Sequence, residues 1–173
     1  EHWTRLAREA KTDEELAPAI EALILAFRDS DVTAVVTAAD AIQAIGAKGA
    51  KAAPALASRL DDPQPWIRTA CMDALQAIGE PAVPSLLEAF RTGPGGAPVR
   101  SLLVLGDMGP AARAAAPELG KALQEAPEAQ RKSIQEALAK IEGTATGAES
   151  AARGGPGEEV VLPPAAPMEA DGR

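Results

Sequence analysis

Aromatic residues are almost missing from the sequence. Among 173 residues there are two Trp, two Phe and no Tyr, although 46% of the residues are hydrophobic. A core of this composition must be filled by Ala, Leu, Ile and Val, which suits helices that lie close together and does not suit packed β-sheets. The composition therefore predicts an all-α fold.

Side chains that carry most enzymatic and metal chemistry are equally scarce. His2 is the single histidine and Cys71 the single cysteine. A Ser-His-Asp or Cys-His arrangement, or a zinc site with three or four His and Cys ligands, lacks its members here. We expect Cys71 to be a small core residue on the buried face of a helix. The sequence thus predicts no catalytic residue, no metal, no cofactor and a chain that is not an enzyme.

Basic clusters and long apolar runs are also missing. The net charge is −8, and residues 93–142 carry six bases against six acids. Binding to nucleic acid through many phosphates needs clustered Lys and Arg, so the charge argues against a nucleic acid partner. No apolar run reaches about 18 residues, so we expect no membrane span. Because the chain begins with Glu1, we expect it to be processed or excised from a longer one, and both a cytoplasmic and an extracytoplasmic location stay open.

The stretch 65–90 contains one complete structural unit. In each half of it, apolar residues recur at steps of three and one, which places them on one face of a helix. Between the halves stand Gly79, which suits the end of a helix, and Pro81, which suits the first turn of the next. These apolar residues are Ile67, Ala70, Cys71, Ala74, Leu75, Ile78, Val83, Leu86, Leu87 and Phe90. Such a helix pair cannot bury its apolar stripes alone, so copies of it should stack beside it.

Two ladders of residues confirm that the unit repeats. One is formed by prolines at intervals of 36, 30 and 33 residues, and the other by glycines at intervals of 33 and 30. The members are Pro18, Pro54, Pro84, Pro117 and Gly46, Gly79, Gly109. A shared period near 33 residues is typical of a helical repeat protein. The expected helices are 1–11, 14–28, 32–45, 51–60, 65–78, 83–90, 99–108, 112–125 and 128–142.

Residues 62–90 resemble a bacterial HEAT repeat of the short, phycobilisome-lyase-like type. The matching residues are Ile67, Arg68, Ala70, Ala74, Leu75, Ile78, Gly79, Pro84, Leu86 and Leu87. Residues 31–60 and 99–124 are similar, and the resemblance covers about 28–142. It implies a right-handed α-solenoid of about four antiparallel helix pairs plus a capping helix over 1–142. It also implies that the first helices lie on the convex side and the second helices on the concave side, where partners commonly bind.

The repeats depart from this pattern in one respect. The family often places an Arg at the start of the first helix, and Arg68 fills that position, but the preceding repeat has Val35 there. In the following repeat the helix is about two residues shorter, so Arg100 is shifted in register. We therefore expect no continuous ladder of Arg-to-acid contacts, and irregular stacking at 93–98.

The candidate sites lie on both helices of the repeats. Trp and Arg are enriched at binding hot spots, although Trp66 at a helix start can equally cover a repeat junction. The polar residues of the second helices would line the concave side. The candidate partner-binding residues are Trp66, Arg68, Met72, Ser85, Glu88 and Lys121.

Several other features have ordinary structural interpretations. The acidic pairs Asp61-Asp62 and Glu14-Glu15 stand beside prolines or at a helix start, where acids serve turns and caps. The glycine-rich stretch 93–96 has no strand before it and no Gly-Lys-Ser or Gly-Lys-Thr after it, so we interpret it as a connection between repeats.

The tail 143–173 has six Gly, four Pro and seven Ala, and we expect it to be disordered. Its one apolar island, 160–164, is either part of a solvated linker or a docking peptide.

The leading functional hypothesis is a non-catalytic module that binds another protein or a larger complex as a scaffold. One alternative is a structural segment of a larger solenoid or assembly. Another follows from the resemblance, since HEAT families include proteins that attach bilins and enzymes that excise damaged DNA bases. The acidic charge opposes the DNA version, and no residue identifies a pigment site.

One substitution tests the predicted helix facing. Leu75 belongs both to the apolar stripe and to the row of residues four before each ladder glycine. Leu75→Ala should therefore lower the free energy of unfolding by about 2 to 5 kcal/mol. An unchanged urea midpoint would show that the facing is wrong.

Overall fold

The computed structural model describes residues 13–29 and 31–143, which contain eight α-helices, three 3-10 helices and no strand. The α-helices are α2 (Asp13–Ala26), α3 (Val32–Ile45), α4 (Ala53–Ser58), α5 (Pro65–Ile78), α6 (Val83–Thr92), α7 (Ala97–Met108), α8 (Ala116–Glu125) and α9 (Glu128–Glu142). The 3-10 helices are η1 (Gly46–Ala52), η2 (Glu80–Ala82) and η3 (Gly109–Ala115). The predicted all-α class is confirmed. The expected helix 1–11 and the tail, with its island 160–164, lie outside the described residues.

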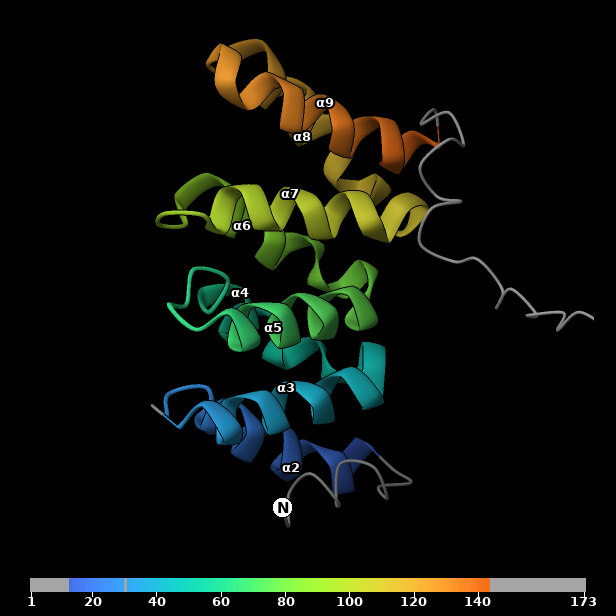
Figure 1. The fold of residues 1–173 in the computed structure, drawn as a ribbon. Coiled ribbons are helices and arrows are strands. Elements are labelled where there is room, and N and C mark those ends of the chain that lie inside the picture. The colour runs from blue at the N-terminus through green and yellow to red at the C-terminus, as the bar shows by residue number, and fades with distance from the viewer. Residues whose placement is uncertain (1–12, 30, 144–173) are drawn as a thin grey trace, which may run out of the picture.

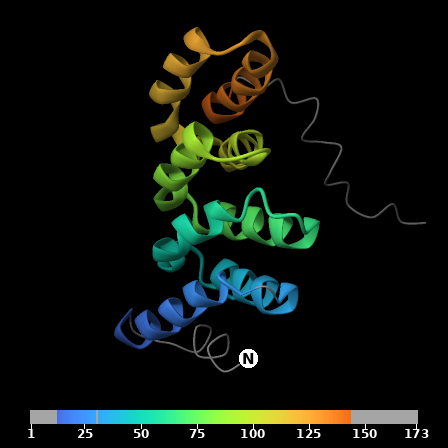
Figure 2. The ribbon, with the colours of Figure 1, turned by 90° about the vertical axis from the view of Figure 1, so that its left-hand side faces the viewer.

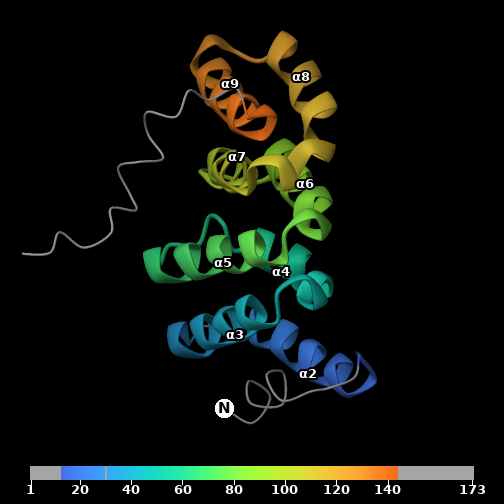
Figure 3. The same ribbon diagram turned by 90° about the vertical axis from the view of Figure 1, so that its right-hand side faces the viewer.

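The helices stack in two layers along one axis (Figure 1). Figures 2 and 3 show α3, α5, α7 and α9 in one layer and α2, α4, α6 and α8 in the other. A 3-10 helix joins the two members of each complete pair, α3–α4, α5–α6 and α7–α8. This arrangement is the predicted α-solenoid, with α9 as the last helix. Its handedness, and which layer is concave, stay predictions.

One continuous apolar core runs through both layers. Its largest fully buried side chains are almost all Leu and Ile, and Phe27 is the one buried aromatic residue among the described residues. Leu75, from the central repeat, is 0% exposed. Val35, which stands where the next repeat has Arg68, is fully buried because α3 is covered by both α2 and α5. The core is thus aliphatic, as the scarcity of aromatic residues predicts.

The three ladder glycines end the first helix of each pair. Gly46, Gly79 and Gly109 have φ of +59°, +75° and +53° with ψ between −129° and −143°. The N–H of Gly79 still donates to the carbonyl oxygen of Leu75 at 3.2 Å. Glycines that end helices commonly adopt the left-handed helical conformation, but the ψ values here are far from that region. The observed combination is more restricted to glycine than a left-handed cap.

Element boundaries differ from the predicted ones around these glycines. The expected helix 112–125 is divided, because η3 occupies its first turn and α8 begins at Ala116. Likewise, α4 is shorter than the expected 51–60, and Leu60 remains fully buried in the turn that follows it. Pro54 and Pro117 lie in the first turns of α4 and α8, where a missing N–H costs nothing.

The junction between α6 and α7 is closed by a side chain from the preceding repeat. α3 packs along α5, and α7 along α9, whereas α5 and α7 share a smaller contact. Across this weaker step, one carboxylate oxygen of Asp61 accepts hydrogen bonds from the backbone N–H of Gly96 at 2.8 Å and from Nη1 of Arg100 at 3.0 Å. The same Nη1 donates to the carbonyl oxygen of Leu60 at 2.9 Å. We call Asp61, Gly96 and Arg100 the repeat clasp.

The repeat clasp bears on two predictions. No continuous ladder of Arg-to-acid contacts was expected, and at this one junction Arg100 nevertheless reaches back to an acid in the preceding turn. Asp61 was assigned to a turn, and its main partners are instead 35 and 39 residues away. The N–H of Gly96, and to a lesser extent Arg100, hold the pKa of Asp61 below its ordinary value of 3.8.

Substitution of Gly79 tests the backbone conformation at the helix ends. Gly79→Val should lower the free energy of unfolding by about 1 to 3 kcal/mol, because Val must adopt a φ that side chains disfavour. Gly120→Ala is the matched control: Gly120 lies within α8 with open space where a Cβ would stand. It should raise the stability by about 0.5 to 1 kcal/mol. If both substitutions changed the free energy of unfolding in urea by the same amount, the positive φ of Gly79 would not matter for stability.

The charge of Asp61 should make the repeat clasp sensitive to acid. Because the pKa is lowered in the folded state, its contribution is present above the ordinary value of 3.8 and lost as the pH falls through the folded value. Asp61→Asn should therefore lower Tm at pH 7, and the gap to the unaltered protein should narrow below pH 4 or so. Asp73→Asn, at an exposed position of α5, is the control. If the difference in Tm between Asp61→Asn and the unaltered protein were the same at pH 7 and pH 2.5, the charge of Asp61 would not contribute to stability.

Candidate protein-binding groove

The candidate residues of the first helices do not form one surface. Trp66, the second residue of α5, is 73% exposed. Arg68 is half-buried, and its Nη1 donates to the carbonyl oxygens of Asp62 at 2.7 Å and Pro63 at 3.0 Å, which fixes the turn before α5. Met72 packs against the core. Of these three, Trp66 alone is available to a partner, while the other two serve the fold.

The candidate residues of the second helices lie in the other layer. Glu88 is exposed on α6 and Lys121 is exposed on α8, while Ser85 is half-buried. Of these residues, Glu88 lines the groove between α6 and the following repeat. The structure thus brings one of the six predicted residues to the edge of a groove, and it places Trp66 in the opposite layer.

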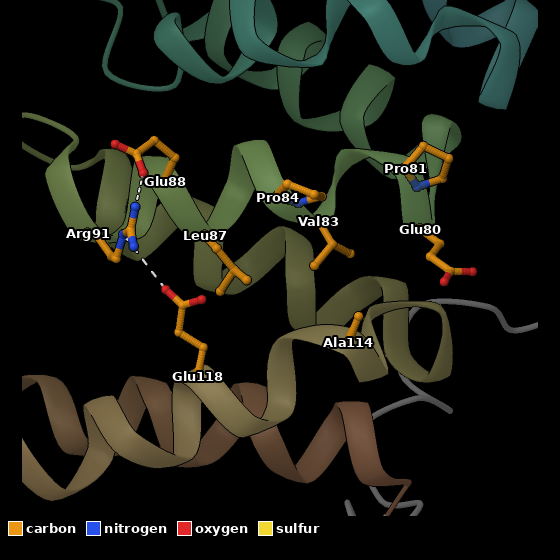
Figure 4. Close-up of a pocket in the computed structure, with 9 residues that line it drawn as sticks. All are labelled: Glu80, Pro81, Val83, Pro84, Leu87, Glu88, Arg91, Ala114 and Glu118. Carbon is orange, nitrogen blue, oxygen red and sulfur yellow. Dashed lines mark hydrogen bonds and ion pairs between the residues drawn. The ribbon is translucent and has the colours of Figure 1, made fainter.

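This groove lies between α6 and the segment formed by η3 and α8 (Figure 4). It has a volume of about 540 Å³, within the usual range for ligand pockets. It is open because α6 packs on η3 and α7, while α8 packs on η3 and α9. The two second helices therefore make little direct contact with each other. We call this cavity the α6–α8 groove.

The middle of the α6–α8 groove is apolar. Two prolines of the η2–α6 turn, Pro81 and Pro84, form one edge, and Val83, Leu87 and Ala114 line the rest. In Figure 4 the side chains of Val83 and Leu87 point from α6 toward the η3–α8 segment. Leu87 is half-buried, so part of an aliphatic side chain faces the cavity.

Charged side chains stand at the ends of the α6–α8 groove. They are Glu80, Glu88, Arg91 and Glu118. Arg91 forms an ion pair with Glu88, and its Nε lies 3.7 Å from a carboxylate oxygen of Glu118. Hydrogen bonds from Arg91 and then Thr92 lower the pKa of Glu88. With three acids and one base, the lining carries a formal charge of −2 at neutral pH.

Sequence reasoning missed most of this groove. Glu88 is the one candidate partner-binding residue among the lining residues, and Glu118 was expected only to lie on the concave side. The cavity depends on how α6 and α8 are placed relative to each other, and no spacing within either helix predicts that placement. The one available signal was the polar, acidic character of the outer face of α8.

Other chemistry in the described part of the chain is limited. Cys71 is fully buried, and burial raises the pKa of its thiol to about 12, so the reactive thiolate is strongly disfavoured. Between residues 13 and 143, no group of three or more His, Cys, Asp or Glu side chains is placed to hold a metal ion. No helix among the described residues is long and apolar enough to cross a membrane.

Comparison with known proteins agrees with the repeat architecture. The family model described as HEAT repeats matches residues 20–105. None of the curated proteins compared with the chain matches it. The bacterial, phycobilisome-lyase-like subtype stays a prediction. The matched segment includes α3 to α6 and most of α7. It carries Pro54 and Pro84 of the proline ladder, Gly46 and Gly79 of the glycine ladder, and the repeat clasp. Residues 20–105 of the chain are therefore HEAT repeats.

Proposed function

We propose that this chain is a non-catalytic protein-interaction module that holds its partner in the α6–α8 groove. HEAT repeats are commonly protein-interaction or scaffold modules. The observation that carries the proposal is an open groove of about 540 Å³ with an apolar middle and charged ends. This combination of an apolar centre and a polar rim is typical of protein-binding surfaces.

The surroundings of the groove support a preformed binding surface. Leu86 and Leu119, on its two sides, are both 0% exposed and anchor α6 and α8 in the core. Each helix is also held by its neighbour in the first layer. Because the walls are fixed by packing, a partner would spend little free energy on ordering them. Trp66 offers a second, separate contact surface in the other layer.

Quantitative affinity capture from source cells would test the proposal. The baits are the unaltered chain, a Glu88→Ala/Glu118→Ala double variant and Trp66→Ala, each analysed by mass spectrometry. We expect at least one protein to be retained by the unaltered chain and by Trp66→Ala, and to be depleted about tenfold or more on the double variant. Chemical cross-links from that protein should map to α6, η3 and α8.

The control is Glu21→Ala, which removes an exposed acid from α2, far from the groove along the solenoid. It should retain the same protein as the unaltered chain. Loss of the partner on Trp66→Ala alone would move recognition to the first layer. The interaction function itself would be refuted if no protein were specifically retained by the unaltered bait at low or moderate salt.

A further inference from the structure

We propose that the α6–α8 groove takes an extended peptide segment of a partner protein in which one aliphatic side chain stands between two basic residues. This inference rests on the proposed function and names the class of partner. It follows from three properties of the groove. The centre is aliphatic and accessible, two of its acids are not fully paired with bases of the protein, and the distance between its ends sets the spacing of the basic residues.

The centre of the groove selects an aliphatic side chain. On α6, Leu86 is 0% exposed, whereas the adjacent Leu87 remains half-buried at the edge of the cavity. Behind it lies Val83, which is only 2% exposed, and the exposed Ala114 completes an apolar lining with no hydrogen-bonding side chain. An aliphatic side chain placed here would remove apolar surface from water on both partners. A polar side chain would lose its water without gaining a hydrogen-bond partner.

Two acids are available to an incoming base. Glu88 is already engaged, because its carboxylate pairs with Arg91 and accepts a hydrogen bond from Thr92 at 3.2 Å. Glu118 has only the Arg91 contact at 3.7 Å, which is longer than a hydrogen bond. Glu80 forms no ion pair within the described residues, and Figure 4 shows it near the opposite end of the groove from Glu118.

The length of the groove sets the spacing of the peptide. Glu88 marks on α6 the end of the groove that holds Glu118, because Arg91 contacts both acids. Glu80 and Glu88 are eight residues apart in the sequence, which corresponds to about 12 Å at ~1.5 Å per residue. An extended peptide advances about 3.3 Å per residue. Two basic residues about four positions apart would therefore reach both ends, and the residue midway between them would face the apolar middle of the groove, where Leu87 and Ala114 are accessible.

The chain's own tail is a poor occupant for the same groove. Residues 143–173 carry five acids and two bases, and the apolar island 160–164 directly follows Glu158 and Glu159. The lining of the groove also has a negative formal charge, so like charges would face each other. Charge complementarity favours a basic segment from a separate protein.

Fluorescence anisotropy with a defined peptide would test this inference on the full chain. The probe is a labelled nine-residue peptide with a central leucine, a lysine two positions away on each side, and glycine or serine elsewhere. We expect saturable binding that weakens as the salt concentration rises. Replacing the leucine by glycine, or both lysines by glutamates, should reduce the affinity about tenfold or more.

Matched variants of the protein locate the site. Glu80→Lys and Glu118→Lys should each weaken binding about tenfold, and Arg91→Ala should strengthen it about threefold, because it removes the competing base. Glu125→Lys is the control: Glu125 is exposed on α8 but does not line the groove, so its reversal should leave the affinity within about twofold. Circular dichroism would confirm that each variant is folded.

Three results would overturn the inference. The first is binding that is indifferent to Glu80→Lys and Glu118→Lys. The second is stronger binding of a labelled peptide that covers residues 157–167, which would make the tail the occupant. The third is no binding of the lysine peptide while affinity capture still depends on Glu88 and Glu118. In that case the groove binds a partner of another chemistry, and the interaction function stands.

Discussion

The structure depends on the fact that no helix pair of this chain can bury its apolar surface alone. Each pair presents an aliphatic stripe that is covered only when another pair stacks on it, so the core is continuous from α2 to α9. Leu75 and Leu105, in successive repeats, are both 0% exposed and occupy the same place before their glycines. The interfaces between repeats therefore contribute to the stability of the fold as much as the repeats themselves do.

Shared burial explains why small residues recur at defined places. Ala and Gly let the two layers approach closely, and the glycines at the ends of α3, α5 and α7 adopt backbone conformations that other residues disfavour. At Gly46 a side chain would also meet the carbonyl oxygen of Ala77 in the next repeat at 3.4 Å. The chain can reverse direction there and still keep the stacked helices in contact.

Local pattern predicted most of the fold and little of the candidate site. Helix positions follow from apolar spacing and glycine breaks, which are properties of consecutive residues, so Ile78 and Leu86 were placed correctly in the core. The repeat clasp was missed because Asp61 and Arg100 lie 39 residues apart and meet only after stacking. The α6–α8 groove was missed for a related reason, since it lies between two helices of different repeats. The proline and glycine ladders show which features successive repeats have in common, whereas the groove depends on how two successive repeats differ.

The step between α5 and α7 gives the solenoid an uneven stiffness. On the side of the first layer this step has the smaller helix contact and a polar fastening at Asp61, while on the other side α6 packs firmly against α7. Under a bending load the molecule would therefore act as two stiff blocks joined by a compliant joint, with the line of α6–α7 contact as the pivot. Apolar packing holds both the blocks and the joint, but the joint also depends on a charged fastening, so added salt would weaken the joint more than the blocks.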